Sequence, residues 1–124
     1  MIREAVDILY NRDMSMAQDQ MNLDLAAVRI GQRYDIFFGG MQGAIKFPNP
    51  LLLEVLWRAY LRTGMQQYLS LVLSTLDNMG RGGIYDHLGG GYAHYATDEE
   101  WLIPHFEKML YDNAQMIDIM TLVW

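Results

Sequence analysis

Side chains able to donate and accept protons are concentrated between residues 86 and 112, in a segment that reads GGIYDHLGGGYAHYATDEEWLIPHFEKMLYD over 82–112. Histidine titrates near neutral pH, and partial burial can raise the pKa of a glutamate toward that range. Such a mixture can therefore move protons at neutral pH. The candidates for catalysis in this segment are His105, Glu107, Asp98 and Asp86.

Pro104 predicts the start of a last helix over 104–124, because proline is favoured at the first position of a helix. The spacing of His105, Lys108 and Asp112 would place all three side chains on one face of that helix. The same spacing also fits an ordinary i,i+4 ion pair between Lys108 and Asp112, an interpretation that needs no function.

Aromatic rings lie among the acids and amides of the same segment. Flat ring faces beside polar groups are typical of a carbohydrate pocket, where they meet the C–H surfaces and hydroxyls of a sugar. Packing in a core explains the same rings without any function, and both interpretations stay open. The rings concerned are Tyr85, Tyr92, Tyr95, Trp101, Phe106 and Tyr111.

Neither a metal site nor a cofactor site is predicted. The chain has no cysteine, which excludes thiolate ligands, disulfides and thiol catalysis. His87, His94 and His105 do not have the spacing of known zinc motifs. The glycines at 82–83 and 89–91 match neither a phosphate-binding loop nor a dinucleotide fingerprint, and we expect tight turns there.

The acidic balance of the chain excludes several classes of partner. A net charge of −6 over 124 residues offers no basic patch to nucleic acid and does not suit an anionic membrane surface. The longest apolar run, PLLLEVLW, contains Glu54 and is too short to span a bilayer. The first residues lack the pattern of a signal peptide, so the sequence predicts a cytoplasmic protein.

The elements that position the candidate residues are predicted to be helices. Residues 1–33 show helical spacing with a break near 11–15, and 34–50 form a loop rich in glycine and proline. Asn49 and Pro50 are typical of an N-cap and a first helical position, and Gly64 of a helix end. A second helix over 66–80 then follows so closely that the two must form an antiparallel hairpin.

Between that hairpin and the last helix, the sequence predicts a glycine-rich loop or a small β-hairpin that pairs 84–88 with 92–96. Thr97 and Glu100 fit a capping box that would open a single helical turn. The fold class expected for the whole is all-α. The last helix stops at Trp124 without a turn signal, which predicts a fragment, and its exposed apolar faces predict a homo-oligomer.

Two long motifs resemble a known family. GGMQGAIKFPNPLLLEVLWRAYLRTG (39–64) and GGIYDHLGGGYAHYATDEEWLIPHFEKMLYDNAQ (82–115) are similar to the signature of the YyaL-like thioredoxin-domain-containing proteins, a family that includes a spermatogenesis-associated protein. The resemblance covers about residues 35–120, and the run PHFEKMLYDNA is its most specific part.

The resemblance implies a thioredoxin-like domain followed by an (α/α)6 toroid of the six-hairpin glycosidase kind, similar to N-acylglucosamine 2-epimerases, cellobiose epimerases and several glycoside hydrolases. Residues 1–124 would be a partial toroid domain without the thioredoxin-like part. Twelve helices with their connections need about 300 residues, so this chain would supply only the first few. The implied activity of the complete protein belongs to carbohydrate metabolism.

The resemblance also implies residues that bind substrate at the inner ends of the helices. His94 stands where the family has an arginine, Ile45 where it has a proline, and Ala96 where it has a serine. The residues implied to bind a sugar-like ligand are Lys46, Tyr92, His94, Trp101, Lys108, Tyr111 and Asp112.

Three functions remain open from the sequence. In an epimerase, a histidine removes a proton beside a carbonyl and a second group returns it, with His105 as the base and Glu107 or Asp98 tuning or replacing it. In a hydrolase, two carboxylates about 5 to 10 Å apart flank the bond, with candidates among Asp86, Asp98 and Glu107. In the non-catalytic alternative, the toroid is a binding or scaffold module for the thioredoxin-like domain.

Overall fold

The computed structural model describes residues 12–124, and in this range the chain forms four α-helices and no β-strand. The expectation of an all-α protein is met over the described part. The helices are α2 (Arg12–Gln32), α3 (Pro50–Thr63), α4 (Gln66–Arg81) and α5 (Leu110–Val123). The helical pattern expected over 2–9 lies outside the described residues. Of the break expected near 11–15, residue 11 lies outside them as well, and over 12–15 the break is wrong because α2 is continuous there.

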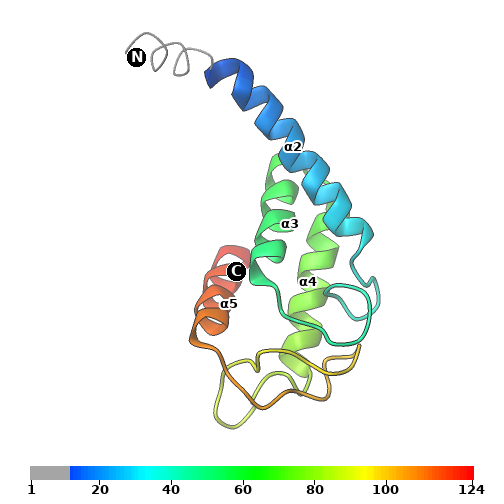
Figure 1. Cartoon of the computed structure of the whole chain (residues 1–124), viewed down its shortest axis with the longest axis vertical. Coiled ribbons are helices and arrows are strands. Elements are labelled where there is room, and N and C mark those ends of the chain that lie inside the picture. The colour runs from blue at the N-terminus through cyan, green and yellow to red at the C-terminus, as the bar shows by residue number, and fades with distance from the viewer. Residues whose placement is uncertain (1–11) are drawn as a thin grey trace, which may run out of the picture.

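The predicted helical hairpin is confirmed as α3 and α4, which run side by side in Figure 1. Leu53, Leu56 and Ala59 recur at helical spacing and are fully buried on α3. Gly64 ends α3 with a φ of 71°, and its N–H donates to the carbonyl of Tyr60. The N-cap prediction is wrong in one respect, because the side chain of Asn49 makes no capping hydrogen bond.

Helix α3 is the central element, since α2, α4 and α5 all pack against it. The two long connections, residues 33–49 and 82–109, lie together at the lower end of the molecule in Figure 1. Both α3 and α5 begin at this end. Within residues 12–124, the connection at the other end is the tight turn between α3 and α4, so the side chains of this range that could do chemistry are gathered at one pole.

The start of the last helix is the main correction. Helix α5 begins at Leu110, not at Pro104. Residues before it are extended instead: the N–H of His105 donates to the carbonyl of Tyr95, and the N–H of His94 donates to the carbonyl of Glu107. His105 and Lys108 therefore do not share a helix face with Asp112, and that prediction is wrong.

The glycine-rich connection over 82–109 is a loop with isolated backbone bridges. Of the predicted small hairpin, one bridge between Tyr85 and Tyr92 is present. The predicted helical turn at Thr97 is absent, because this region forms a non-helical turn. Ala96 bridges to both Lys46 and Pro104. Its bridge to Lys46 joins this loop to the other long connection by backbone hydrogen bonds.

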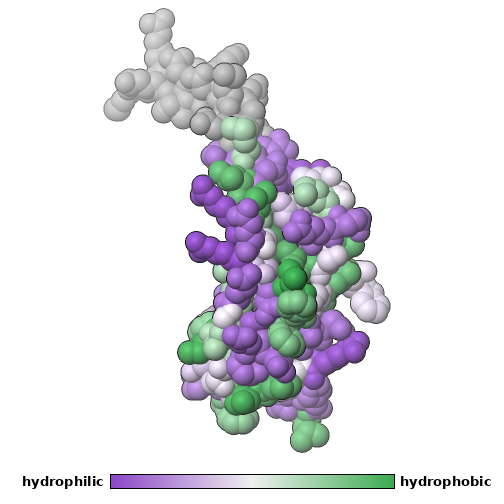
Figure 2. All heavy atoms as spheres, turned by 90° about the vertical axis from the view of Figure 1, so that its right-hand side faces the viewer, coloured by the Kyte–Doolittle hydropathy of each residue, from purple (hydrophilic) through white to green (hydrophobic). Residues whose placement is uncertain are grey.

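Apolar groups stay exposed among polar ones, as Figure 2 shows for one face. On α5, Leu110 and Ile117 are exposed, and Phe37 is exposed in the first long connection. None of the helices described has the length and apolar character needed to cross a bilayer. The oligomer expected from apolar exposure stays a prediction.

Substitution of Gly40 by alanine is expected to destabilise the fold strongly. Its φ is 69°, and a Cβ would lie 2.4 Å from Cζ2 of Trp101. Gly90 is a matched control, since its φ is 77° but no atom lies within 4 Å of its Cβ position. Gly90→Ala should cost about 1 to 2 kcal/mol from backbone strain, and Gly40→Ala about 1 to 3 kcal/mol more from overpacking. Urea unfolding of the two variants measures the difference, and equal losses would show that packing against Trp101 contributes nothing.

Candidate functional site

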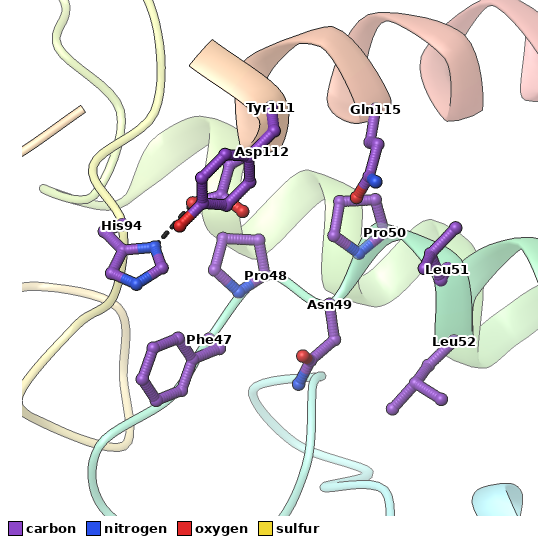
Figure 3. A pocket seen from close by; sticks show the side chains of 10 residues that line it. All are labelled: Phe47, Pro48, Asn49, Pro50, Leu51, Leu52, His94, Tyr111, Asp112 and Gln115. Atoms are coloured by element: carbon purple, nitrogen blue, oxygen red, sulfur yellow. Dashed lines mark hydrogen bonds and ion pairs between the residues drawn. The ribbon is translucent and has the colours of Figure 1, made fainter. Parts of the chain in front are cut away.

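A pocket of about 500 Å³ lies between the N-terminal ends of α3 and α5 (Figure 3). Its walls come from three places: the segment before α3 with the first turn of that helix, the loop at residue 94, and the first turns of α5. The lining residues are Phe47, Pro48, Asn49, Pro50, Leu51, Leu52, His94, Tyr111, Asp112 and Gln115.

His94 and Asp112 form a hydrogen-bonded pair at one end of this pocket. Nδ1 of His94 lies 2.5 Å from Oδ2 of Asp112, and the side chains are 24% and 14% exposed. Figure 3 shows the two groups facing each other, the imidazole from the loop and the carboxylate from the first turn of α5. The main chain of His94 is fixed as well, because its N–H donates to the carbonyl of Glu107.

Aromatic rings hold the imidazole of His94 on several sides. The ring of Phe47 meets it edge-on with centroids 5.2 Å apart, and that of Tyr111 with centroids 6.2 Å apart. Tyr95 adds a third ring at 5.8 Å. Because these contacts restrict rotation of the ring, the orientation set by Asp112 is maintained.

This arrangement fixes the role of each ring nitrogen. When Nδ1–H donates to the carboxylate of Asp112, Nε2 carries the free lone pair and can act as a base. No residue between 12 and 124 forms a hydrogen bond with Nε2 of His94. The pair therefore combines an oriented base with a carboxylate that stabilises the imidazolium formed on protonation.

The predicted catalytic residues His105 and Glu107 are brought close to each other but do not line this pocket. Nδ1 of His105 lies 3.9 Å from Oε2 of Glu107, and both side chains are about half exposed. The ring of His105 stacks on Tyr95 with centroids 4.6 Å apart and an angle of 11°. Glu107 instead lines a second hollow, together with Asp86 and Lys108.

Asp86, another predicted catalytic residue, stabilises its own loop through hydrogen bonds. Its carboxylate accepts hydrogen bonds from the amides of Leu88 and Gly89 and lies 2.7 Å from Nζ of Lys108. The amide of Gly89, the ammonium of Lys108 and the amide of Leu88, in that order, hold the pKa of Asp86 well below its usual value. The ion pair expected between Lys108 and Asp112 is thus wrong, because each of them has a different partner.

Asp98 closes the turn that follows it. Its carboxylate accepts hydrogen bonds from the amides of Glu100, Leu102 and Ile103. Desolvation alone would raise the pKa of Asp98, but the amides of Ile103, Leu102 and Glu100 together lower it below the usual value. The side chain is ionised and its acceptor capacity is used within the fold.

Lys46 and Trp101, both predicted to bind substrate, are buried. Nζ of Lys46 lies 2.7 Å from Oδ2 of Asp35 and donates to the carbonyl of Gly39. The Trp101 ring lies over that ammonium with its centroid at 5.6 Å, and its Nε1 donates to the carbonyl of Phe38. Trp101 keeps a φ of 65°, a conformation rare for a large residue, because these contacts fix its indole.

Several residues of the site had no signal in the sequence analysis. Asp35 lies in the segment predicted only as a loop rich in glycine and proline, although it is the partner of Lys46. Asn113 was also missed: its amide bonds both the N–H and the carbonyl of Tyr92, which fixes the predicted residue Tyr92 in the core. Over residues 12–124, no three histidine or acidic side chains gather as metal ligands would.

The chain is similar to a short segment of longer known proteins. No family model matches the chain. It is 43% identical to spermatogenesis-associated protein 20 of Mus musculus over 97 residues, and 37% identical to the Homo sapiens protein of that name over 124 residues. The chain is homologous to part of spermatogenesis-associated protein 20. The Rattus norvegicus relative is 45% identical over 92 residues.

These alignments cover 75%, 92% and 71% of the chain, but only 12%, 16% and 12% of the respective relatives. The chain thus spans less than one fifth of the length of the spermatogenesis-associated proteins that it matches.

Loss of the buried lysine is expected to cost far more than loss of the exposed one. Lys46→Met leaves the carboxylate of Asp35 partly buried without its partner, which should lower the free energy of unfolding by about 3 kcal/mol or more. Lys108→Met is the matched control and should cost under about 1 kcal/mol, since its ion pair is exposed to solvent. Chemical denaturation compares them, and similar losses would contradict a stabilising role for the buried pair.

Stability should fall in acid partly through Asp98. Because its folded-state pKa is lowered, the ionised carboxylate stabilises the fold above the usual aspartate pKa of about 3.9. That contribution is lost as the pH falls through the lower folded-state value. We expect Asp98→Asn to be less stable than the unsubstituted chain at pH 7 and to show a shallower decline below pH of about 4. Asp118→Asn, at an exposed position of α5, is the control. The measurement is the free energy of unfolding as a function of pH. If the curve of Asp98→Asn ran parallel to that of the unsubstituted chain, the stabilising role of the ionised Asp98 would be refuted.

Proposed function

We propose that the pocket between α3 and α5 is one wall of a carbohydrate site in a longer protein, and that His94 transfers a proton there. The observation that carries this proposal is the 2.5 Å contact between Nδ1 of His94 and Asp112 at the pocket's edge. A histidine oriented by a carboxylate, with its second nitrogen open, is the arrangement that general-base catalysis needs.

The lining of the pocket suits a sugar better than a flat apolar ligand. Rings of Phe47 and Tyr111 can meet the C–H face of a sugar, while the amides of Asn49 and Gln115 can bond its hydroxyls. Among the residues that the structure describes, no lysine or arginine lines the pocket. A volume of about 500 Å³ is within the range of small-molecule sites.

Epimerase-like chemistry is favoured over hydrolysis. Glycoside hydrolysis needs one carboxyl group as an acid with a raised pKa, yet Asp86 and Asp98 have lowered pKa values and are bonded to backbone amides. In the epimerase-like reaction, Nε2 of His94 removes a proton from the carbon beside a carbonyl, and Asp112 stabilises the resulting imidazolium. A second acidic group, supplied by the rest of the longer protein on the opposite side of the sugar, gives its proton to the other face of that carbon and inverts it, leaving His94 protonated.

The arrangement of the helices supports the (α/α)6 toroid as the larger fold. Helices α3 and α5 begin at the pole that holds both long connections, and α2 and α4 end there. Alternation of this kind is expected when helical hairpins are arranged as the inner and outer layers of a ring. We propose that the remaining hairpins and a thioredoxin-like domain belong to the same longer, cytoplasmic protein, whose length is that of the spermatogenesis-associated relatives.

A scaffold function is the second candidate, and one observation favours it. The signature residues Lys46, Asp98 and Trp101 all bond within the chain and stabilise its loops. A module whose signature residues serve such contacts would bind or position the thioredoxin-like domain without catalysing a reaction.

A screen of the full-length protein for conversion of reducing sugars and oligosaccharides distinguishes carbohydrate catalysis from the scaffold function. His94→Asn should lower kcat/KM for the converted sugar by about 100-fold or more, the usual contribution of a general base. His87→Asn is the matched control, because its imidazole lies outside the pocket between α3 and α5. Activity lost in His105→Asn but kept in His94→Asn would move the base to His105, and no conversion of any sugar would favour the scaffold.

A further inference from the structure

The two long connections contain the same structural unit. The sequence Tyr-Asp-x-x-x-Gly-Gly occurs at 34–40 and again at 85–91. In the first unit the Asp35 carboxylate accepts two amides and pairs with Lys46, whose ammonium also bonds the carbonyl of Gly39. In the second, Asp86 accepts two amides and pairs with Lys108, whose ammonium also bonds the carbonyl of Gly90. We call these units the first clamp and the second clamp.

The main-chain contacts repeat as well. Tyr34 bridges Met41 in the first unit, and Tyr85 bridges Tyr92 in the second. In both, the aspartate N–H donates to the carbonyl of the second glycine of the motif: that of Asp35 to Gly40, and that of Asp86 to Gly91. Each clamp joins the end of one helix to the approach to the next, so the repeated unit is a helix, a clamp and a second helix.

The first clamp is covered by the loop of the second unit. Ala96 forms two hydrogen bonds with the main chain of Lys46, each 2.8 Å long. Trp101 lies over the Lys46 ammonium and packs against Gly40, while Thr75 of α4 lies against Gly39. The side chain of Lys46 is therefore 1% exposed.

The second clamp has the same internal bonds, but nothing between residues 12 and 124 covers it. The side chains of Lys108 and Asp86 are 44% and 39% exposed, and no atom lies within 4 Å of the Cβ position of Gly90. Between residues 12 and 124, nothing bonds the main-chain N–H or carbonyl of Lys108. The hollow beside the clamp measures about 670 Å³, and the fully exposed side chains of Leu88 and Phe106 line it.

We propose that a further helical hairpin of the same polypeptide covers the second clamp, as the α4–α5 unit covers the first. Its long loop pairs with the main chain of Lys108 in the manner of Ala96 and lays an aromatic ring over the Lys108 ammonium. Its first helix approaches Gly90 as α4 approaches Gly39. The spermatogenesis-associated relatives supply the necessary length, since the chain spans only 12% to 16% of them.

A second copy of this chain does not fit the same surface. The ring that would have to cover Lys108 is Trp101, which is completely buried against its own first clamp. A two-fold dimer through this surface would instead bring two second clamps together, with neither supplying an extended segment to the other.

Hydrogen exchange of the Lys108 amide tests the proposal in two proteins, the 124-residue chain and the full-length polypeptide that contains it. The Lys46 amide is the internal control and should exchange slowly in both, because Ala96 accepts its hydrogen bond. The Lys108 amide should exchange rapidly in the 124-residue chain and at least about tenfold more slowly in the full-length polypeptide. Equal exchange in the two proteins would overturn the proposal, and so would protection in the short chain that grows with its concentration.

Alanine at the two equivalent glycines gives an independent measurement. Gly39→Ala should be severely destabilising in both proteins, because its Cβ would lie 2.5 Å from Cα of Thr75. Gly90→Ala should be mild in the short chain, but in the full-length polypeptide it should remove the protection of the Lys108 amide. Retained protection in that variant would exclude a helix at Gly90. Neither readout depends on sugar conversion, so this proposal and the proposed function can fail separately.

Discussion

The burial of a charged lysine beneath a tryptophan is the interaction on which the arrangement of the loops depends. An ammonium removed from water is costly unless it is paired and hydrogen-bonded. Lys46 meets this requirement through Asp35 and the carbonyl of Gly39, and Trp101 then lies on top of it. Each of these groups comes from a different part of the two connections. The pairing therefore fixes the path of both loops at once.

The pocket between α3 and α5 follows from this arrangement. Lys46 stands just before Phe47 and Pro48, which form one wall. Its bridge to Ala96 places His94, two residues earlier in the chain, opposite α5. Asn113 then hydrogen-bonds Tyr92 to the first turn of α5. In the same turn, Asp112 bonds the imidazole of His94. Residues that hold the loops and residues that face the pocket thus alternate along the chain, which is why the signature mixes both kinds.

The helical hairpin was predictable because its signals are local. Apolar spacing, Pro50 and Gly64 each act within one or two turns. Helix α3 begins and ends where these signals placed it, and α4 begins at the predicted Gln66 and ends one residue after the predicted Gly80. Pro104 misled because proline suits extended backbone as well as a first helical turn. Here Pro104 bridges Ala96 within the same long connection, and this backbone pairing outweighed the local preference for a helix. Such pairing depends on tertiary contacts that no local pattern encodes.

The pair formed by His94 and Asp112 could not be predicted for the same reason, because the extended path of 104–109 brings them together across 18 positions. The repeated Tyr-Asp-x-x-x-Gly-Gly motif was readable in the sequence, but its meaning was not. The lysine that completes it lies 11 positions after Asp35 and 22 after Asp86, so the repeat breaks before its last member.

That difference in spacing has an evolutionary consequence. The ion pair pins the beginning of a connection to its end, whatever length of chain lies between. Insertions between the aspartate and the lysine can accumulate without shifting the helices, and the inserted residues become the covering that the neighbouring unit receives. A family built from such units could diversify the connections between its helices by loop growth alone, while the packing of the helices stayed unchanged.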